Sequence, residues 1–319
     1  MCFKNEAKYL GETISSILAQ TELGFELIAV DDNSEDESVQ ILKKYAEQDS
    51  RIRIFSNQGN GIIDALKTGY AATTGKLITR HDADDLMPVY KLAALKEILV
   101  QNGAGHIATG LVKYFSDNDL AEGFIKYADW LNDLCKTSSH AKNVFKECVI
   151  ASPNWMAYKK DLESINAFQD EVYPEDYNLV FKMIEKNLKI VCSDKITHLW
   201  RDHPARASRT LEQYKDQKYY ALKVKFFIKF YGKKNIILWG AGPSGKGLAK
   251  ELIAQKVCFR WVTNNKNKIG RSIYDVDVES FECLKNTNGK VLISVTQRDS
   301  LEEIKGFLDG NKICDWFLF

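Results

Sequence analysis

The feature that most limits the fold is a regular alternation of strand-like and helix-like segments over the first hundred residues. Short apolar runs with few polar interruptions predict strands, and apolar residues spaced three or four positions apart predict helices. The predicted strands cover residues 25–30, 51–57 and 76–82, and the predicted helices cover 34–48 and 61–75. This order predicts an α/β fold with a mostly parallel sheet that has helices on its faces.

Composition narrows the class of protein. A length of 319 residues suggests about two domains, and a net charge of +1 gives no argument for a nucleic-acid partner. Seven cysteines occur without a CxxC spacing, which argues against a disulfide framework and a zinc site and fits a reducing cytoplasm. No secretory signal is visible at residues 1–10, and no apolar run reaches the ~18 residues of a membrane span.

Acidic residues follow two of the predicted strands. Asp31 and Asp32 come after the first strand, and Asp82, Asp84 and Asp85 come after the third. The carboxyl ends of parallel strands meet at one edge of the sheet, where ligands bind, so both groups are expected at one rim. Such acids suit a divalent cation that also holds a diphosphate, whereas the plainer alternative is a solvated acidic turn.

Beyond residue 105 the alternation is weaker. A helix is predicted over 175–187, a strand over 189–194 and a basic loop over 197–210. Three arginines and a histidine in this loop suit contacts to diphosphate oxygens, although a solvated loop is the alternative. These residues are Arg201, His203, Arg206 and Arg209.

A second, smaller α/β unit is predicted over 235–319, after a helix over 211–234 that has seven lysines and two acids. That helix is interpreted as a linker whose aromatic residues pack on one domain, with contact to an anionic membrane face as the alternative. Gly240, Gly242 and Gly245 form a G-x-G-x-x-G turn between a strand and a helix, the context of a phosphate-binding turn. Tight strand–helix packing explains the glycines equally well.

The motifs occur in a characteristic order. "CFKNE", "FELIAVDDNSEDES", "KLITRHDADD", "PEDYNLVFKMIEKN" and "HLWRDHPARASRT" together make residues 1–210 resemble a family 2 glycosyltransferase with the GT-A nucleotide-diphospho-sugar fold. The C-terminal unit resembles Rossmann-like modules fused behind some members. The resemblance implies inverting transfer of a sugar, from a UDP-sugar in preference, to a glycan or lipid-linked hydroxyl acceptor. It also implies Mn²⁺ or Mg²⁺, cell-surface polysaccharide biosynthesis, and a cytoplasmic location that includes the inner membrane face.

The resemblance also implies roles for individual residues. Asp176 is the catalytic base, with Glu175 beside it, and the alternative for Asp176 is stabilisation of a helix N-terminus. Asp84 is the preferred metal ligand, with Asp82 and His203 as further ligands. The residues expected at the donor nucleotide are Phe3, Asn5, Glu6, Asp31, Asp32, Asp82, Arg201 and Arg206. Four other histidines have no assigned ligand role: His81, His106, His140 and His198.

Two departures from the family pattern limit these expectations. The family opens with a buried apolar strand before the segment that corresponds to "CFKNE", so the first strand is expected to be missing, at a cost in donor affinity and stability. In the C-terminal unit, Thr263, Asn264 and Asn265 stand where a ribose-binding acid is expected, which argues against a dehydrogenase. The remaining rival is a catalytically impaired binding or scaffold protein.

Overall fold

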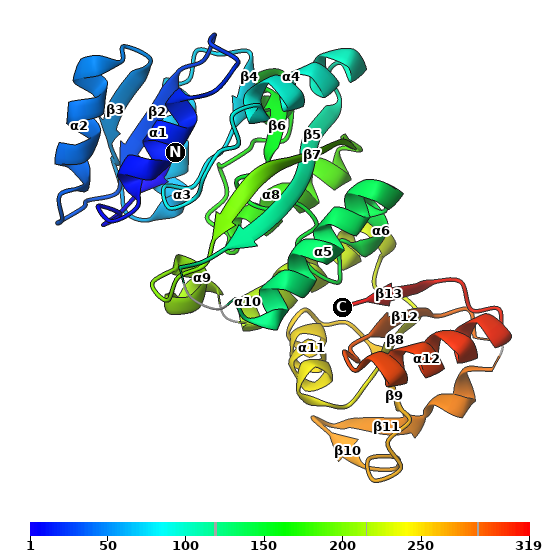
Figure 1. The fold of residues 1–319 in the computed structure, drawn as a ribbon. Helices are drawn as coiled ribbons and strands as arrows, with labels where there is room; N and C mark the ends of the chain where they lie inside the picture. The colour runs from blue at the N-terminus through cyan, green and yellow to red at the C-terminus, as the bar shows by residue number, and fades with distance from the viewer. Residues whose placement is uncertain (118–119, 215, 286) are drawn as a thin grey trace. The chain divides into compact units, whose positions relative to one another are not determined.

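The computed structural model of the protein describes residues 1–117, 120–214, 216–285 and 287–319. The chain forms two compact units (Figure 1). The first unit holds residues 1–141 and 148–211, and the second holds 142–147 and 212–319.

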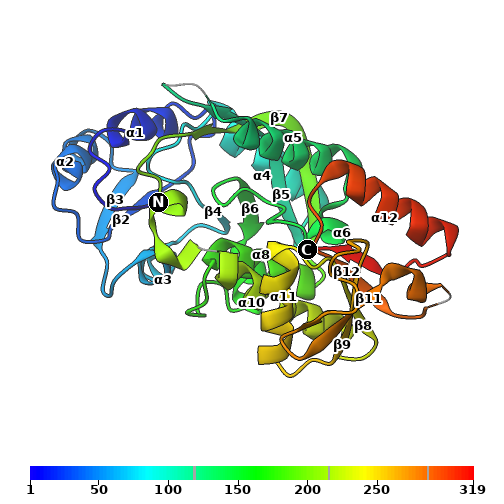
Figure 2. The same ribbon diagram turned by 90° about the horizontal axis from the view of Figure 1, so that it is seen from below.

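The N-terminal half of the first unit is a parallel sheet in the order β1-β2-β3. Its strands are β1 (Cys2–Phe3), β2 (Leu27–Asp31) and β3 (Ile52–Ser56). Its helices are α1 (Leu10–Leu18), α2 (Ser38–Gln48) and α3 (Ile62–Ala72). Figure 2 shows α1 and α2 on one face of the sheet and α3 on the other. The predicted strands and helices of this region are therefore confirmed, with ends shifted by a few residues.

The C-terminal half of the first unit is a mixed sheet in the order β4-β6-β5-β7. Its strands are β4 (Leu77–Thr79), β5 (His106–Phe115), β6 (Trp155–Tyr158) and β7 (Lys189–Arg201). Its helices are α4 (Lys91–Asn102), α5 (Glu122–Thr137), α6 (His140–Asn143), α7 (Lys159–Ser164), α8 (Glu175–Glu185) and α9 (Ala207–Thr210). β6 is antiparallel to both of its neighbours, whereas β5 and β7 are parallel. The α/β class is confirmed.

The predicted basic loop over 197–210 is wrong in its first part, because β7 continues to Arg201. The β5 ladder explains the extension, since residues up to Phe115 pair with β7 as far as Arg201. Most residues of this stretch are buried, including Thr197, His198, Trp200 and Arg201. The strand was not predicted because polar residues such as Thr197 and Arg201 interrupt its apolar pattern, although the structure buries them.

A cavity of about 740 Å³ lies between the two sheets of the first unit. Its lining includes Met1 and Ile28 on the β1-β2 side and Ile78 and Tyr158 on the β4-β6 side. Among the described residues, β1 pairs with β2 and forms no ladder with β4. β1 has two residues, and the predicted loss of a longer first strand stays a prediction.

The second unit is a sheet in the order β10-β11-β9-β8-β12-β13. Its strands are β8 (Ile236–Trp239), β9 (Phe259–Thr263), β10 (Ser272–Ile273), β11 (Val276–Ser280), β12 (Lys290–Ile293) and β13 (Trp316–Leu318). Its helices are α10 (Asp216–Tyr231), α11 (Pro243–Ala254) and α12 (Arg298–Gly310), with short 3₁₀ turns at Glu212–Tyr214 and Phe281–Leu284. Apart from β10, all pairings are parallel and follow the Rossmann order, as predicted.

Helix α10 occupies the segment predicted as a linker, and it belongs to the second unit. Phe226 and Phe227 are buried, and Phe227 contacts the ring of Phe145 at 5.4 Å, whereas Lys225 and Lys229 are exposed. The aromatic side of α10 therefore packs on its own unit. Among the residues that the structure describes, no helix is both long enough and apolar enough to cross a membrane.

Candidate active site

Asp32 lies directly after β2 and is buried at the edge of the first sheet. Its Oδ1 accepts hydrogen bonds from Nδ2 of Asn57 (2.6 Å) and from the backbone N–H of Gly61 (2.9 Å). Asn57 follows β3, so two neighbouring strand ends build this position. The sequence prediction included Asp32 and missed Asn57, although the place of Asn57 as the last residue of a predicted strand was the available signal.

Asp31 and Asn5 shape the loop beside Asp32. Oδ1 of Asp31 accepts from the N–H of Ser34 (3.0 Å), and Oδ1 of Asn5 accepts from the N–H of Glu35 (2.8 Å). Asn5 itself has a φ of 57°, a left-handed conformation that asparagine tolerates better than most residues. Both predicted donor-site residues therefore hold a backbone turn in this structure.

Arg80 connects the end of β4 with the beginning of α8. Its Nε donates to Oδ1 of Asp82 (3.0 Å), and its Nη1 donates to Oε1 of Glu175 (3.0 Å). The side chains of Arg80 and Glu175 are largely buried, so this ion pair is well shielded from solvent. The contact brings the predicted acid motif and the predicted catalytic pair to one place. Sequence reasoning missed Arg80, which lies two residues before the first acid of the motif.

Asp176 is the second residue of α8 and lies beside this ion pair. Its Oδ1 accepts a hydrogen bond from the N–H of Tyr177 (2.8 Å), which is the helix-stabilising contact considered as the alternative role. Burial and the neighbouring Glu175 carboxylate nevertheless raise the pKa of Asp176 to about 7, against the opposing effect of Arg80. A carboxylate with a pKa near neutrality is suited to act as a general base.

Asp84 and His203 approach each other across the loop that follows β7. Nε2 of His203 lies 2.9 Å from Oδ2 of Asp84, and Nε of Arg201 donates to the backbone carbonyl of Asp84 (2.8 Å). The side chain of Asp84 is 17% exposed, so a ligand can reach it. The structure thus brings together two of the three residues predicted to hold a metal.

The charge on this face is negative and only partly balanced. Burial, together with the carboxylates of Asp84, Asp36 and Asp82, raises the pKa of Glu6 to about 8. Glu6, Asp82, Asp84 and Asp176 are called the acid rim below. Their mutual repulsion would fall if a cation bound between them.

The acid rim fits a divalent cation that is bound partly by its substrate. Mg²⁺ and similar hard cations are held by one or two carboxylates plus phosphate oxygens in nucleotide sites. Within the described part of the chain, the rim does not bring three ligand atoms within 4.8 Å of one another. Asp84 and His203 would therefore supply two ligands and leave the other positions to a diphosphate and water.

Asp85 points away from the rim into a buried polar network. Its Oδ1 accepts from the backbone N–H of Arg201 (2.7 Å), and its Oδ2 lies 3.0 Å from Nε2 of His198. Burial raises the pKa of Asp85 and lowers those of His81 and His198, while burial lowers the pKa of Lys91 to about 7. The network joins the loop after β4 to β7 and keeps Asp84 in place.

Two residues predicted at the donor site are engaged by the protein itself, and their contact with a nucleotide stays a prediction. Phe3 is 3% exposed and packs in the hydrophobic core with residues such as Leu10 and Ile14, so its ring is not presented for stacking. Arg201 is 5% exposed, with its guanidinium 4.6 Å from the Tyr9 ring and Nη2 donating to Glu12. Its Nε and Nη2 groups are therefore engaged by the protein.

Arg206 and Arg209 also contact neighbouring protein groups. The guanidinium of Arg206 lies 5.2 Å from the Trp200 ring, and Nη2 of Arg209 donates to Asp202 (2.7 Å). Arg206 remains a candidate for diphosphate contact because its surroundings leave it partly exposed.

The glycine turn of the second unit lies between β8 and α11. Gly240 has a φ of 123°, and a Cβ on Gly245 would lie 2.0 Å from the carbonyl oxygen of Gly240. A Cβ on Gly242 would meet no atom within 4 Å. Gly240 therefore allows the turn, Gly242 leaves open space, and Gly245 allows close packing, which is typical of a dinucleotide-type turn. A phosphate ligand at this turn stays a prediction.

The structure is an α/β protein with a group of acidic side chains, the acid rim, near its strand ends. The model of the family "Glycosyl transferase family 2" matches residues 1–165, more than half of the chain. The chain belongs to glycosyl transferase family 2.

One relative by sequence and two solved structures are similar to this chain. An uncharacterized glycosyltransferase of Haemophilus influenzae is 27% identical over 194 residues, which cover 56% of each chain, so this chain spans about half of that relative. TarS of S. aureus in complex with UDP superposes with a TM-score of 0.53 at 17% identity, over 79% of this chain and 69% of TarS. The mannosyltransferase PcManGT of Pyrobaculum calidifontis, in complex with GDP-Man and Mn²⁺, gives 0.53 at 16% identity, over 80% and 67%. The two structures support the GT-A fold.

Proposed function

We propose that this protein is an inverting glycosyltransferase that moves a sugar from a nucleotide-diphospho-sugar, with UDP-sugars favoured, to a hydroxyl acceptor. The observation that carries the proposal is the ion-paired link from Asp82 through Arg80 to Glu175, next to Asp176. It places a candidate base beside an acidic face at the strand ends, where α/β proteins bind ligands. Family membership and the UDP and GDP-Man complexes of the structural neighbours support the same reaction class.

The reaction follows from the roles of these residues. Asp176 accepts the proton of the acceptor hydroxyl, whose oxygen forms a bond to the anomeric carbon as the bond to the diphosphate breaks. The bonding electrons leave with the diphosphate, and a single displacement inverts the configuration at that carbon. Asp32 would bind the nucleoside, since a carboxylate can accept the uracil imide hydrogen, and the hydrogen bond from Asn57 would orient it.

A divalent cation, Mn²⁺ or Mg²⁺, would be held by Asp84 and His203, with Asp82 nearby. When bound, it would neutralise the negative charge of the leaving diphosphate. By family analogy, the acceptor is a glycan or a lipid-linked precursor of a cell-surface polysaccharide.

The test combines binding and turnover on the purified full chain. UDP at about 100 times its Kd, with Mn²⁺, should stabilise the folded protein by ~2.7 kcal/mol, which corresponds to a rise in Tm of about 5–10 °C. A panel of UDP-sugars should then identify a donor from which UDP is released in the presence of Mn²⁺. Asp84→Ala should abolish the release.

Glu97→Ala is the matched control, because Glu97 is an exposed carboxylate on α4. It should retain full UDP release. Full turnover by Asp84→Ala would overturn the metal assignment. Failure of every nucleotide-sugar to change the Tm, with or without Mn²⁺, would instead favour a binding or scaffold protein.

A further inference from the structure

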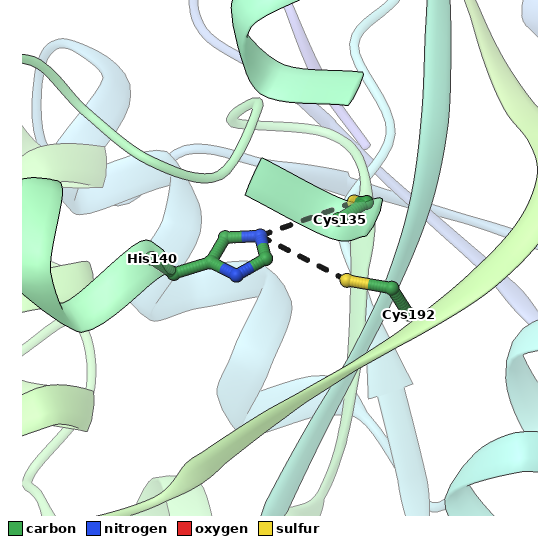
Figure 3. Close-up of side chains that lie close together, drawn as sticks. All are labelled: Cys135, His140 and Cys192. Atoms are coloured by element: carbon green, nitrogen blue, oxygen red, sulfur yellow. Dashed lines mark hydrogen bonds between the residues drawn. The ribbon is translucent and has the colours of Figure 1, made fainter. Parts of the chain in front are cut away.

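A cluster of soft ligand atoms lies in the first unit, outside the acid rim. Cys135 is in the last turn of α5, His140 begins α6, and Cys192 lies near the beginning of β7. Figure 3 shows the imidazole of His140 directed at both sulfur atoms. Nε2 of His140 is 3.9 Å from Sγ of Cys135 and 3.8 Å from Sγ of Cys192.

The fold explains how residues far apart in the sequence meet at this point. Ser138 ends α5 in the left-handed conformation, with a φ of 50°, and turns the chain so that His140 lies back toward Cys135. Cys192 lies on β7, where it pairs with Thr109 of β5. The cysteine spacing predicted no zinc site and His140 had no assigned role, because neither contact is visible in the sequence.

The distances agree with those of a tetrahedral zinc site. Zn–S bonds of about 2.3 Å and Zn–N bonds of about 2.05 Å place sulfur and nitrogen roughly 3.6 Å apart at tetrahedral angles. All three ligand atoms lie within 4.8 Å of one another, and within the described residues this is the one such group of three or more. Shifts of a few tenths of an ångström would close the geometry.

We propose that Cys135, His140 and Cys192 bind one Zn²⁺, with a fourth position open to solvent. Two thiolates and an imidazole are soft or borderline ligands that select zinc over the hard cations expected at the acid rim. His140 is 2% exposed, and both cysteines are partly exposed, so an ion can enter while its nitrogen ligand stays fixed. Zinc there would tie α5 to β7.

The site is separate from the acid rim. Cys192 and Arg201 are nine positions apart on β7, which corresponds to about 30 Å of extended chain. Zinc at this cluster should therefore stabilise the first unit without taking part in transfer. If the cluster does not bind zinc, the proposed glycosyltransferase activity is unaffected.

The experiment measures metal content in the full chain, purified with a thiol-free reductant and incubated with Zn²⁺. After desalting, inductively coupled plasma mass spectrometry should find about one zinc per chain, and Co²⁺ in place of zinc should give a thiolate-to-cobalt charge-transfer band. Cys192→Ser should lose both signals. The matched control Cys314→Ser alters an exposed cysteine of the second unit and should keep both.

Zinc should also raise the Tm of the wild-type chain and not that of Cys192→Ser. Zinc content that is unchanged in Cys192→Ser would overturn the site, as would a reduced wild-type chain that binds no zinc. If Cys192→Ser does not fold, the cobalt spectrum of the wild-type chain decides. A charge-transfer band supports the site, and its absence overturns it.

Discussion

Asp84 and Asp85 are neighbours in the chain, yet they belong to two regions with opposite properties. The acid rim has partly exposed side chains, with Asp82 at 28% and Asp84 at 17%, and its carboxylates repel one another. The buried network behind it has side chains that are at most 4% exposed, including Asp85 and His198, which face each other. The comparison shows that burial and partners, rather than residue type, separate a ligand-binding acid from a structural one.

The largest effect is expected from removal of the candidate base in the rim. Asp176→Asn should lower kcat for UDP release by about 10²–10⁴-fold, because an amide cannot accept the acceptor proton. Its Tm should be unchanged or higher, since the amide replaces a carboxylate that burial disfavours. UDP release and thermal melting, both compared with Glu97→Gln, measure the two effects.

Wild-type turnover by Asp176→Asn would show that the helix-stabilising contact to Tyr177 is the role of this carboxylate. A large fall in both kcat and Tm would place Asp176 with the buried network instead, and the division between the two regions would fail at this position.

The second effect concerns the network. Asp85→Ala removes the acceptor for the Arg201 N–H and the partner of His198, and it should destabilise the first unit by about 3 kcal/mol. The expected fall in Tm is about 6–12 °C, measured by thermal melting. At temperatures below the Tm of the Asp85→Ala variant, its apparent affinity for Mn²⁺ should stay within about tenfold of that of the wild type.

Asp84→Ala, a variant of the neighbouring residue, is the control for Asp85→Ala. It should leave the Tm within a few degrees of wild type, because Asp84 is partly exposed. If Asp85→Ala abolished Mn²⁺ dependence at an unchanged Tm, the network would have to be counted as part of the metal site.

The sequence predicted the α/β class, three strands and two helices between residues 25 and 82, and the Rossmann-like unit, because their apolar periods are regular and closed by glycine or acidic turns. It did not predict α1. It did not predict β5, whose partner β7 is more than 80 residues away in the chain. Long-range pairing of this kind leaves no local pattern. The end of β7 was missed for the same reason, since its polar residues Thr197 and Arg201 are buried only through pairing with β5.

For the candidate site, the sequence indicated which acids belong to the motif but not which way each side chain points. From the sequence, Asp84 was assigned the metal role and Asp85 no role, and nothing indicated that Asp85 lies beside His198, which is 113 positions away. Arg80 was missed because its two partners, Asp82 and Glu175, lie on different elements. A carboxylate pKa depends on such three-dimensional neighbours, so Asp176 could be named but its pKa near 7 could not.

The smallest effect is a pH shift within the rim. If Asp176 is the base, kcat/KM should fall about tenfold per pH unit below its pKa of about 7 and level off above it. The contribution of Asp176 to the free energy of unfolding should change with pH in the opposite direction to kcat/KM. The folded state keeps the proton between pH 3.8 and about 7 whereas the unfolded state loses it, so this contribution to the free energy of unfolding falls as pH rises through that window.

Glu175→Gln sharpens this test, because it removes the neighbouring carboxylate that helps to raise the pKa of Asp176. The acid limb of the kcat/KM profile should move to lower pH, while Glu97→Gln should leave it in place. A limb that moves to higher pH would mean that Glu175 acts mainly by holding Arg80 beside Asp176, since Arg80 lowers the same pKa. A limb that does not move at all would assign the titration to another group and separate the pH dependence from the acid rim.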